Sequence, residues 1–376
     1  MMDEQTLNRE FNRYPDWMSP AERARAYEVG EEVDRIPLSL SVGETMAPEF
    51  GFTVGEYRRS VEVRCRMREQ VLEQLGLHAG MGVRMGLKGI GEALGTVVKY
   101  PENDLDIVQQ TVLRDYGQLP SLKLDPEHNP FLQGKLAEIR AIKARLGADF
   151  PVSTSVAGPI STALAIREAS LVMRDMIRAP EQLQQLLAFG VACSVAWVEL
   201  VTGAFGPVSV GIAEPGASSS LISLRQFRTF CKPHLKTLME EIRRITGRRS
   251  VLHICGRSKA IWADLLDVGV TSFSVDNCED LAQLKQVMGD RVAISGNVPP
   301  VEVMRDGSID DVIHSVQQCL CKASDSPMGY TLDVGCQIPI GTPLRNLKAY
   351  LYAARRYGRG AKKGALCRGL IEEGLV

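Results

Sequence analysis

The feature that most constrains the fold of this chain is the regular alternation of short apolar segments with amphipathic ones. Eight apolar segments are separated, for the most part, by stretches with the periodicity of helices. The apolar segments are residues 36–40, 82–86, 151–156, 208–213, 250–254, 271–275, 292–295 and 330–334. Helical patterns cover residues 224–244, 280–288 and 310–323. Alternating strands and helices predict a parallel α/β architecture, and eight strands predict a closed (β/α)8 TIM barrel.

The length of 376 residues suits one such barrel with insertions, so we expect residues 1–376 to form a single domain. Residues 1–30 are polar and helix-forming, which predicts an N-terminal helical extension. Within it, Ser19, Pro20 and Glu22 have the spacing of the N-cap, first and third residues of a helix. Residues 42–145 are less regular and are expected to decorate the barrel through its early loops.

The charge and the hydropathy pattern exclude several classes of protein. A net charge of −1 argues against a strongly cationic protein that binds nucleic acid or a membrane surface. The first ten residues lack the apolar segment of a secretory signal, and nine cysteines are too few for a disulfide scaffold, so we expect a cytoplasmic protein with reduced thiols. Residues 186–213 are long and apolar enough to span a bilayer. Gly206 and Pro207 divide them, which favours a buried helix followed by a buried strand.

Polar residues with catalytic chemistry follow the predicted strands. In a parallel barrel the functional groups come from the carboxyl ends of the strands, which all lie at one edge. Along the chain these positions are occupied by Glu214, His253, Cys255, Asp276, Asn297 and Cys336. One imidazole, two thiols and two carboxyl groups are therefore expected to meet at that edge.

The imidazole and the two thiols form the donor set of a metal site. His253 and Cys255 are separated by one residue, which on a strand directs both side chains to the same face. Cys336 follows the last strand, and one imidazole with two thiolates suits a tetrahedral zinc ion. Three protein ligands with an exchangeable fourth position are typical of catalytic zinc, and Asp276 is a candidate for the fourth ligand. The alternative interpretation of the H-x-C triplet alone is a core histidine beside a buried cysteine.

Most of the remaining cysteines are interpreted as structural, because they fall in predicted helices or in the C-terminal tail, where a free cysteine behaves as a small hydrophobe. They are Cys65, Cys193, Cys231, Cys319, Cys321 and Cys367. Cys278 lies near the proposed site but is not assigned as a ligand. The sequence contains neither a G-x-x-x-x-G-K-[ST] phosphate loop nor a G-x-S-x-G elbow.

The segments that carry the candidate ligands resemble the uroporphyrinogen decarboxylase superfamily, and more narrowly its corrinoid-dependent methyltransferase branch of the methylcobalamin:coenzyme M type. The resemblance rests on LHICGRSKAIWADLLDVGVTSFSVD, VAISGNVPP and VGCQIPIGTPLRNLKAYLYAARRYG, preceded by SPAERARAYEVGEEVDRIPL, VAGPISTALAIR and IAEPGASSSLISLRQFRTFCKPHLKTL. It covers residues 19–358. Members of this superfamily are (β/α)8 barrels, in agreement with the strand count.

The resemblance implies roles for the residues at the strand ends. His253, Cys255 and Cys336 correspond to the zinc ligands of the methyltransferase branch and would be the catalytic residues. Asp276 corresponds to the acidic residue of the next strand, where close relatives are expected to carry Glu. Glu214 stands where an Asp-Pro pair is typical, and it is expected to bind substrate together with Asp276 and Asn297.

The activity implied by the resemblance is zinc-dependent methyl transfer between a corrinoid (cobalamin) protein and a small substrate. That substrate is a thiol such as coenzyme M or a methoxylated compound, and the corrinoid is expected to be supplied by a partner protein. The alternatives are a uroporphyrinogen decarboxylase-type lyase acting on a tetrapyrrole, methyl transfer to tetrahydrofolate by a zinc-free branch, and a non-enzymatic protein that binds a corrinoid partner or stores metal. The lyases carry an arginine-rich signature of the R-Q-A-G-R type, which is absent from residues 36–50, and they lack the zinc triad.

Overall fold

The structure, a computed structural model, describes residues 2–376, and these form two compact units. The terminal unit comprises the described residues up to Ala79, the short segment Glu102–Asp104, and Ser272–Val376. The central unit comprises Gly80–Pro101 and Leu105–Thr271. That residues 1–376 form one domain stays a prediction.

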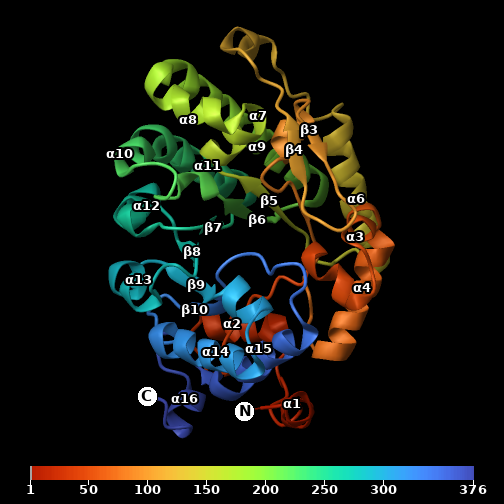
Figure 1. The fold of residues 1–376 in the computed structure, drawn as a ribbon, viewed down its shortest axis with the longest axis vertical. Coiled ribbons are helices and arrows are strands. Elements are labelled where there is room, and N and C mark those ends of the chain that lie inside the picture. The colour runs from red at the N-terminus through yellow and green to blue at the C-terminus, as the bar shows by residue number, and fades with distance from the viewer. Residues whose placement is uncertain (1) are drawn as a thin grey trace. The chain divides into compact units, whose positions relative to one another are not determined.

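The central unit begins with β2 (Gly82–Arg84) and ends with α12 (Trp262–Val268) (Figure 1). Between them lie α5 (Gly89–Ala93), β3 (Val97–Lys99), β4 (Ile107–Gln110), η2 (Tyr116–Ser121), α6 (Pro130–Leu146), β5 (Ser153–Ala157), α7 (Pro159–Ile166), α8 (Ala169–Arg178), α9 (Pro180–Phe205), β6 (Ser209–Ala213), η3 (Pro215–Ala217), α10 (Leu224–Gln226), η4 (Phe227–Cys231), α11 (Lys232–Thr246), β7 (Val251–Ile254) and η5 (Lys259–Ile261). Strands β2, β5, β6 and β7 pair in parallel in that order, so their carboxyl ends share one edge.

The terminal unit contains both the first and the last helices of the described chain. Its elements are α1 (Glu4–Phe11), α2 (Pro20–Glu28), β1 (Val33–Arg35), η1 (Glu44–Phe50), α3 (Val54–Arg59), α4 (Val61–Leu75), β8 (Ser272–Val275), α13 (Leu281–Met288), β9 (Ala293–Val298), η6 (Pro300–Arg305), α14 (Ile309–Ala323), β10 (Tyr330–Val334), α15 (Leu344–Tyr357), β11 (Arg359–Ala361) and α16 (Arg368–Glu372). Strands β8, β9 and β10 pair in parallel, and α15 packs against α14 and α1.

Seven of the eight predicted strands form, which confirms an α/β protein with parallel strands. The prediction of a strand at residues 36–40 is wrong, because this segment makes only one isolated bridge, between Leu38 and Leu332, parallel to β10. The carbonyl of Pro37 accepts a hydrogen bond from the N–H of Leu332. Pro37 has no N–H of its own to donate to β10, so the ladder stops there. The regular strand lies earlier, at β1, and pairs antiparallel with β11.

The N-terminal helical extension is confirmed as α1 and α2. Ser19 caps α2 as predicted, because its side chain accepts from the backbone N–H of Glu22 while the Glu22 carboxylate accepts from the N–H of Ser19. Pro20 occupies the first position of the helix, where its missing N–H costs nothing. The extension therefore follows from local capping rules.

The apolar stretch that began at residue 186 belongs to α9, which is followed by β6 as predicted. This 26-residue helix is long and apolar enough to cross a membrane, yet half of its most apolar window is buried within the protein. It packs against α7 and α11. Trp197 on α9 is fully buried and donates its indole N–H to Oγ1 of Thr154 on β5, which ties the helix to the parallel strands.

Candidate metal centre

His253 and Cys255 lie together at the carboxyl end of β7. Leu252 and Ile254 are fully buried, so the alternation of the strand directs His253 and Cys255 to the opposite face, where both are half-buried. Nε2 of His253 lies 2.9 Å from Sγ of Cys255. The predicted pairing of the two side chains is therefore present, with an imidazole nitrogen and a sulfur within reach of one ion.

The backbone turns away from the strand immediately after Cys255. Gly256 has φ of +74°, a conformation that favours glycine, and a Cβ at this position would lie 2.7 Å from Oγ of Ser218. The next residue, Arg257, accepts a backbone hydrogen bond of 2.7 Å from Ser219. This turn holds the Cys255 end of β7 against the loop that follows β6.

Glu214 is fully buried at the end of β6, where hydrogen bonds hold both its carboxyl group and its backbone. Its Oε1 accepts hydrogen bonds from the backbone N–H and the hydroxyl of Ser161, at 3.1 and 2.9 Å, and its own N–H donates to the carbonyl of His253 at 2.8 Å. Ser161 is the third residue of α7, whose N-cap, Gly158, has no side chain, so the Glu214 carboxyl group caps that helix. Burial raises the pKa of Glu214 to about 8, and the bonds from Ser161 oppose this rise only in part.

The role of Ser161 could not be predicted from its neighbours in sequence, because its partner is 53 residues away. The other oxygen of Glu214, Oε2, accepts no hydrogen bond from the described residues and faces Gly158, where a Cβ would lie 2.0 Å away. A larger residue at position 158 would therefore displace the carboxyl group. That Glu214 binds substrate stays a prediction.

Three further predicted site residues lie together in the terminal unit. Asp276 directly follows β8, and its Oδ1 accepts the N–H of Cys278 at 2.9 Å. Asn297, near the end of β9, donates its amide hydrogens to the carbonyls of Asp276 and Glu279, at 3.1 and 2.8 Å. The sequence placed Asp276 and Asn297 at one edge, and the structure links them directly.

Cys336 follows β10 and is held beside the same loop. The N–H of Gly335 donates to the carbonyl of Val298 at 2.8 Å. A Cβ on Gly335 would lie 2.6 Å from the backbone nitrogen of Asn277, so only glycine allows this approach. The thiol of Cys336 is half-buried, like that of Cys255.

The other cysteines differ from these two in their surroundings. Cys65, Cys193, Cys231, Cys319 and Cys367 are buried, as their structural interpretation requires. Burial raises the pKa of the Cys193 and Cys367 thiols to about 12, which makes their thiolates inaccessible at neutral pH. Cys321 is half-buried and Cys278 is exposed.

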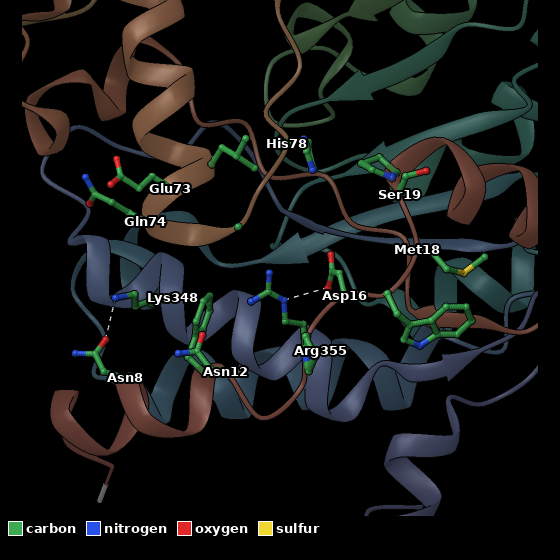
Figure 2. A pocket seen from close by; sticks show the side chains of 16 residues that line it. Asn8, Asn12, Asp16, Met18, Ser19, Glu73, Gln74, His78, Lys348 and Arg355 are labelled. Carbon is green, nitrogen blue, oxygen red and sulfur yellow. Dashed lines mark hydrogen bonds and ion pairs between the residues drawn. The ribbon is translucent and has the colours of Figure 1, made fainter.

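A groove of about 810 Å³ lies in the terminal unit and is lined by the segment between α1 and α2, the end of α4, and α15 (Figure 2). Asp16 and Arg355 line it and are joined by a bond of 3.1 Å. Leu38 pairs in parallel with Leu332 on β10, so residues before Leu38 lie toward the amino end of β10. Arg35, which lies beside the groove, comes before Leu38, whereas Cys336 follows the carboxyl end of β10. The groove is therefore at the amino ends of the strands. Within the terminal unit it is therefore separate from Cys336.

Comparison with known proteins gives a consistent result. A model of the uroporphyrinogen decarboxylase (URO-D) family matches residues 19–357. The chain is 28% identical over 349 residues to the methylcobamide:CoM methyltransferase MtaA of Methanosarcina barkeri, covering 87% of this chain and 95% of that protein. It is 23% identical over 353 residues to the methylated-thiol–coenzyme M methyltransferase of Methanosarcina mazei, covering 90% and 89% of the two chains.

Two further similarities concern the decarboxylases and the fold. Uroporphyrinogen decarboxylase of Pseudoalteromonas atlantica is 22% identical over 315 residues, covering 81% of this chain and 86% of that protein. The solved structure of a methyltransferase from Methanosarcina mazei superposes with a TM-score of 0.73 at 24% identity, covering 90% of this chain and 98% of the other. At this identity the superposition establishes a common fold.

Proposed function

Because the chain belongs to the uroporphyrinogen decarboxylase family, we propose that it is a zinc-dependent methyltransferase that works with a corrinoid protein. Among the relatives, those named methylcobamide:CoM methyltransferase are 26–28% identical to this chain, whereas those named uroporphyrinogen decarboxylase are 22–25% identical. This favours methyl transfer over decarboxylation of a tetrapyrrole.

The observation that carries the proposal is the donor set of His253, Cys255 and Cys336. One imidazole nitrogen and two thiol sulfurs could hold a metal ion, and zinc is the metal that such a set favours. Two of the three donors already lie 2.9 Å apart at the end of β7. We include Asp276 as the candidate fourth ligand, since an oxygen donor is easily exchanged for a substrate sulfur.

The ligands suit the activation of a thiol. When bound, zinc lowers the pKa of a coordinated thiol so that the thiolate, which is the nucleophile, is present at neutral pH. Cys255 and Cys336 contribute two negative charges, which keep the substrate sulfur electron-rich. The half-buried positions of both thiols leave a substrate access to them while limiting the water around them.

The proposed substrates follow from the relatives. A methyl group would pass between the corrinoid of a separate protein and the sulfur of a small thiol, with coenzyme M as the first thiol to test. A methoxylated compound as methyl donor is the second option, with the same ligands acting on an ether oxygen. We expect the protein to act in the cytoplasm, where thiols stay reduced.

The decisive experiment is the zinc content of freshly purified, reduced protein, measured by elemental analysis beside three variants. We expect about one zinc per chain in the wild type and in Cys278→Ala, and almost none in Cys336→Ala or His253→Ala. Cys278 is the matched control, because it is an exposed cysteine two residues from Asp276. Zinc retained in Cys336→Ala would contradict the ligand assignment.

The activity is tested with methylcobalamin as methyl donor and coenzyme M as acceptor. Demethylation of the corrinoid that depends on His253 and Cys336 would support the proposal. If the wild-type protein contains no zinc and decarboxylates uroporphyrinogen, the methyltransferase proposal is wrong and the protein is a lyase. If it binds zinc but transfers no methyl group to any thiol or from any methoxylated compound, a non-enzymatic role is indicated.

A further inference from the structure

Asn297 joins three elements of the terminal unit through a single buried amide. Its side chain is on β9 and is 8% exposed. Both amide hydrogens are used, because Nδ2 donates to the carbonyl of Asp276 at 3.1 Å and to the carbonyl of Glu279 at 2.8 Å. These two carbonyls lie three residues apart in the loop of residues 276–280 between β8 and α13, so one side chain bridges most of the loop that carries Asp276.

The oxygen of the same amide is also directed into the protein. Oδ1 of Asn297 faces the Sγ of Cys319 on α14 at 3.8 Å, and Cys319 is buried. A substrate group that accepted a hydrogen bond from Nδ2 of Asn297 would have to displace one of these two carbonyls, because the amide has only two hydrogens to donate. That Asn297 binds substrate stays a prediction, and the contacts described here show only what it does within the protein.

The residue after Asn297 fixes the second loop of the site. The carbonyl of Val298 accepts the N–H of Gly335, and Gly335 packs directly against the backbone of Asn277. The end of β9 thus holds the Asp276 loop through a side chain and the Cys336 loop through the backbone. Within the Asp276 loop, the bond from the Cys278 N–H to Oδ1 of Asp276 fixes the direction of the carboxylate.

We infer that Asn297 is a positioning residue, which holds the Asp276 loop against the Cys336 loop and thereby supports the presentation of Cys336 to a metal ion. This inference rests on the proposed function for the identity of the ion. The contacts of Asn297 with the loop are independent of it, and the experiment therefore includes a measurement that needs no metal.

The test compares Asn297→Ala and Asn297→Ser with the same substitutions at Asn346. Asn346 is the matched control because it is fully buried in the same unit, and its Nδ2 likewise donates to two carbonyls, of Met304 and Gly307, both at 2.9 Å. Zinc affinity is measured by competition with a chelator. We expect affinity to fall by about 10- to 100-fold in the Asn297 variants, the range typical of lost support for a metal ligand, and to stay unchanged in the Asn346 variants.

Two readouts separate positioning from general stability. In the Co²⁺-substituted protein, the visible spectrum reports ligand geometry, and we expect it to change in Asn297→Ala but not in Asn346→Ala. In the metal-free protein, hydrogen exchange of residues 276–279 is expected to accelerate at least tenfold in Asn297→Ala alone. Asn297→Ser keeps one donor, so an intermediate effect is expected and the milder change preserves the fold.

The outcomes distinguish the inference from the proposed function. If the wild type binds no zinc, the proposed function is wrong, and exchange of residues 276–279 still decides whether Asn297 holds the loop. If the wild type binds zinc but the Asn297 and Asn346 variants have equal affinity, spectra and exchange, Asn297 has no positioning role.

Discussion

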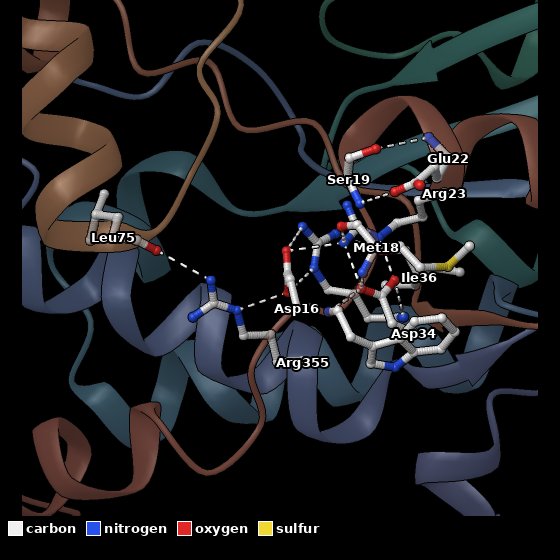
Figure 3. A network of polar contacts seen from close by, with 11 residues as sticks. Asp16, Met18, Ser19, Glu22, Arg23, Asp34, Ile36, Leu75 and Arg355 are labelled. Atoms are coloured by element: carbon white, nitrogen blue, oxygen red, sulfur yellow. Dashed lines mark hydrogen bonds and ion pairs between the residues drawn. The ribbon is translucent and has the colours of Figure 1, made fainter.

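In the terminal unit, buried polar side chains have different partners at the two ends of the strands. At the amino end, charged side chains bind one another: Asp34 lies 2.6 Å from Arg23, and Asp16 lies 2.7 Å from Arg35 and 3.1 Å from Arg355 (Figure 3). At the carboxyl end, Asn297 and Gly335 instead bind backbone groups. At the amino end, the carboxylates and the arginines neutralise one another. At the carboxyl end, the hydrogen bonds fix the loops, and Asp276 and Cys336 stay half-buried.

The difference teaches which end of the strands carries stability and which carries chemistry. The amino-end network joins the N-terminal extension to β1 and α15, and its arginines are nearly inaccessible to solvent. Burial acts to raise the pKa of Asp16, but the hydrogen bond and charge of Arg35, with the charges of Arg355 and Arg23, hold it below its usual value. The carboxylates there remain ionised and serve the fold, in keeping with the division of labour between the two faces of parallel barrels.

Breaking the amino-end network is expected to have the largest effect. In Asp34→Asn, Arg23 loses its main partner while remaining buried, with side chains 5% and 2% exposed in the wild-type pair. We expect the free energy of unfolding, measured in urea, to fall by about 3–5 kcal/mol. Zinc bound per folded molecule should not change. Asp306→Asn, in an exposed pair with Arg305, should cost less than about 1 kcal/mol, and equal losses in the two variants would contradict the comparison.

The same network predicts how stability depends on pH. Asp16 and Asp34 have folded-state pKa values below those of the unfolded chain, so their contribution is complete above about pH 4 and is lost as the pH falls through the folded values. Unfolding free energies between pH 2 and 6 should fall on acidification, by at most about 1.4 kcal/mol per pH unit for each carboxylate. Asp16→Asn should flatten this slope. An unchanged slope would show that the arginines do not hold Asp16 ionised.

The smallest effect is expected at the carboxyl end. Asp276→Ala removes a candidate ligand and one hydrogen bond, to the N–H of Cys278, and this residue is only half-buried. We expect stability to change by less than about 1 kcal/mol, while zinc affinity falls about tenfold. A large loss of stability with unchanged affinity would reverse the roles assigned to the two ends, and it would remove Asp276 from the ligand set.

Local rules in the sequence predicted much of this fold. The capping residues of α2, the helix–strand succession at α9 and β6, and the same-face placement of His253 and Cys255 all depend on neighbours within a few residues. The prediction of a strand at residues 36–40 is wrong because Pro37 has no backbone N–H for the ladder, and the pattern of apolar residues carries no information about that missing donor.

The remaining features depend on contacts between distant residues. Arg355 is only 8% exposed because it is bonded to Asp16, which lies 339 residues away in the sequence. The bonds of Asn297 and the cap that Glu214 provides for α7 are equally invisible in the sequence, because each requires two loops to meet. Residue type is enough to nominate candidate donors, but tertiary packing determines which contacts support them.

Helix α9 has a consequence for the synthesis of the chain. Its apolar surface is covered partly by α11, which ends at Thr246, 41 residues after α9 ends at Phe205. At about 5–20 residues per second, the ribosome needs roughly 2–8 s to make that interval. During this time a helix with the length and hydropathy of a membrane anchor lacks α11, which covers one of its faces in the folded protein. Slow elongation after residue 205 would thus favour aggregation or mistargeting of the nascent chain.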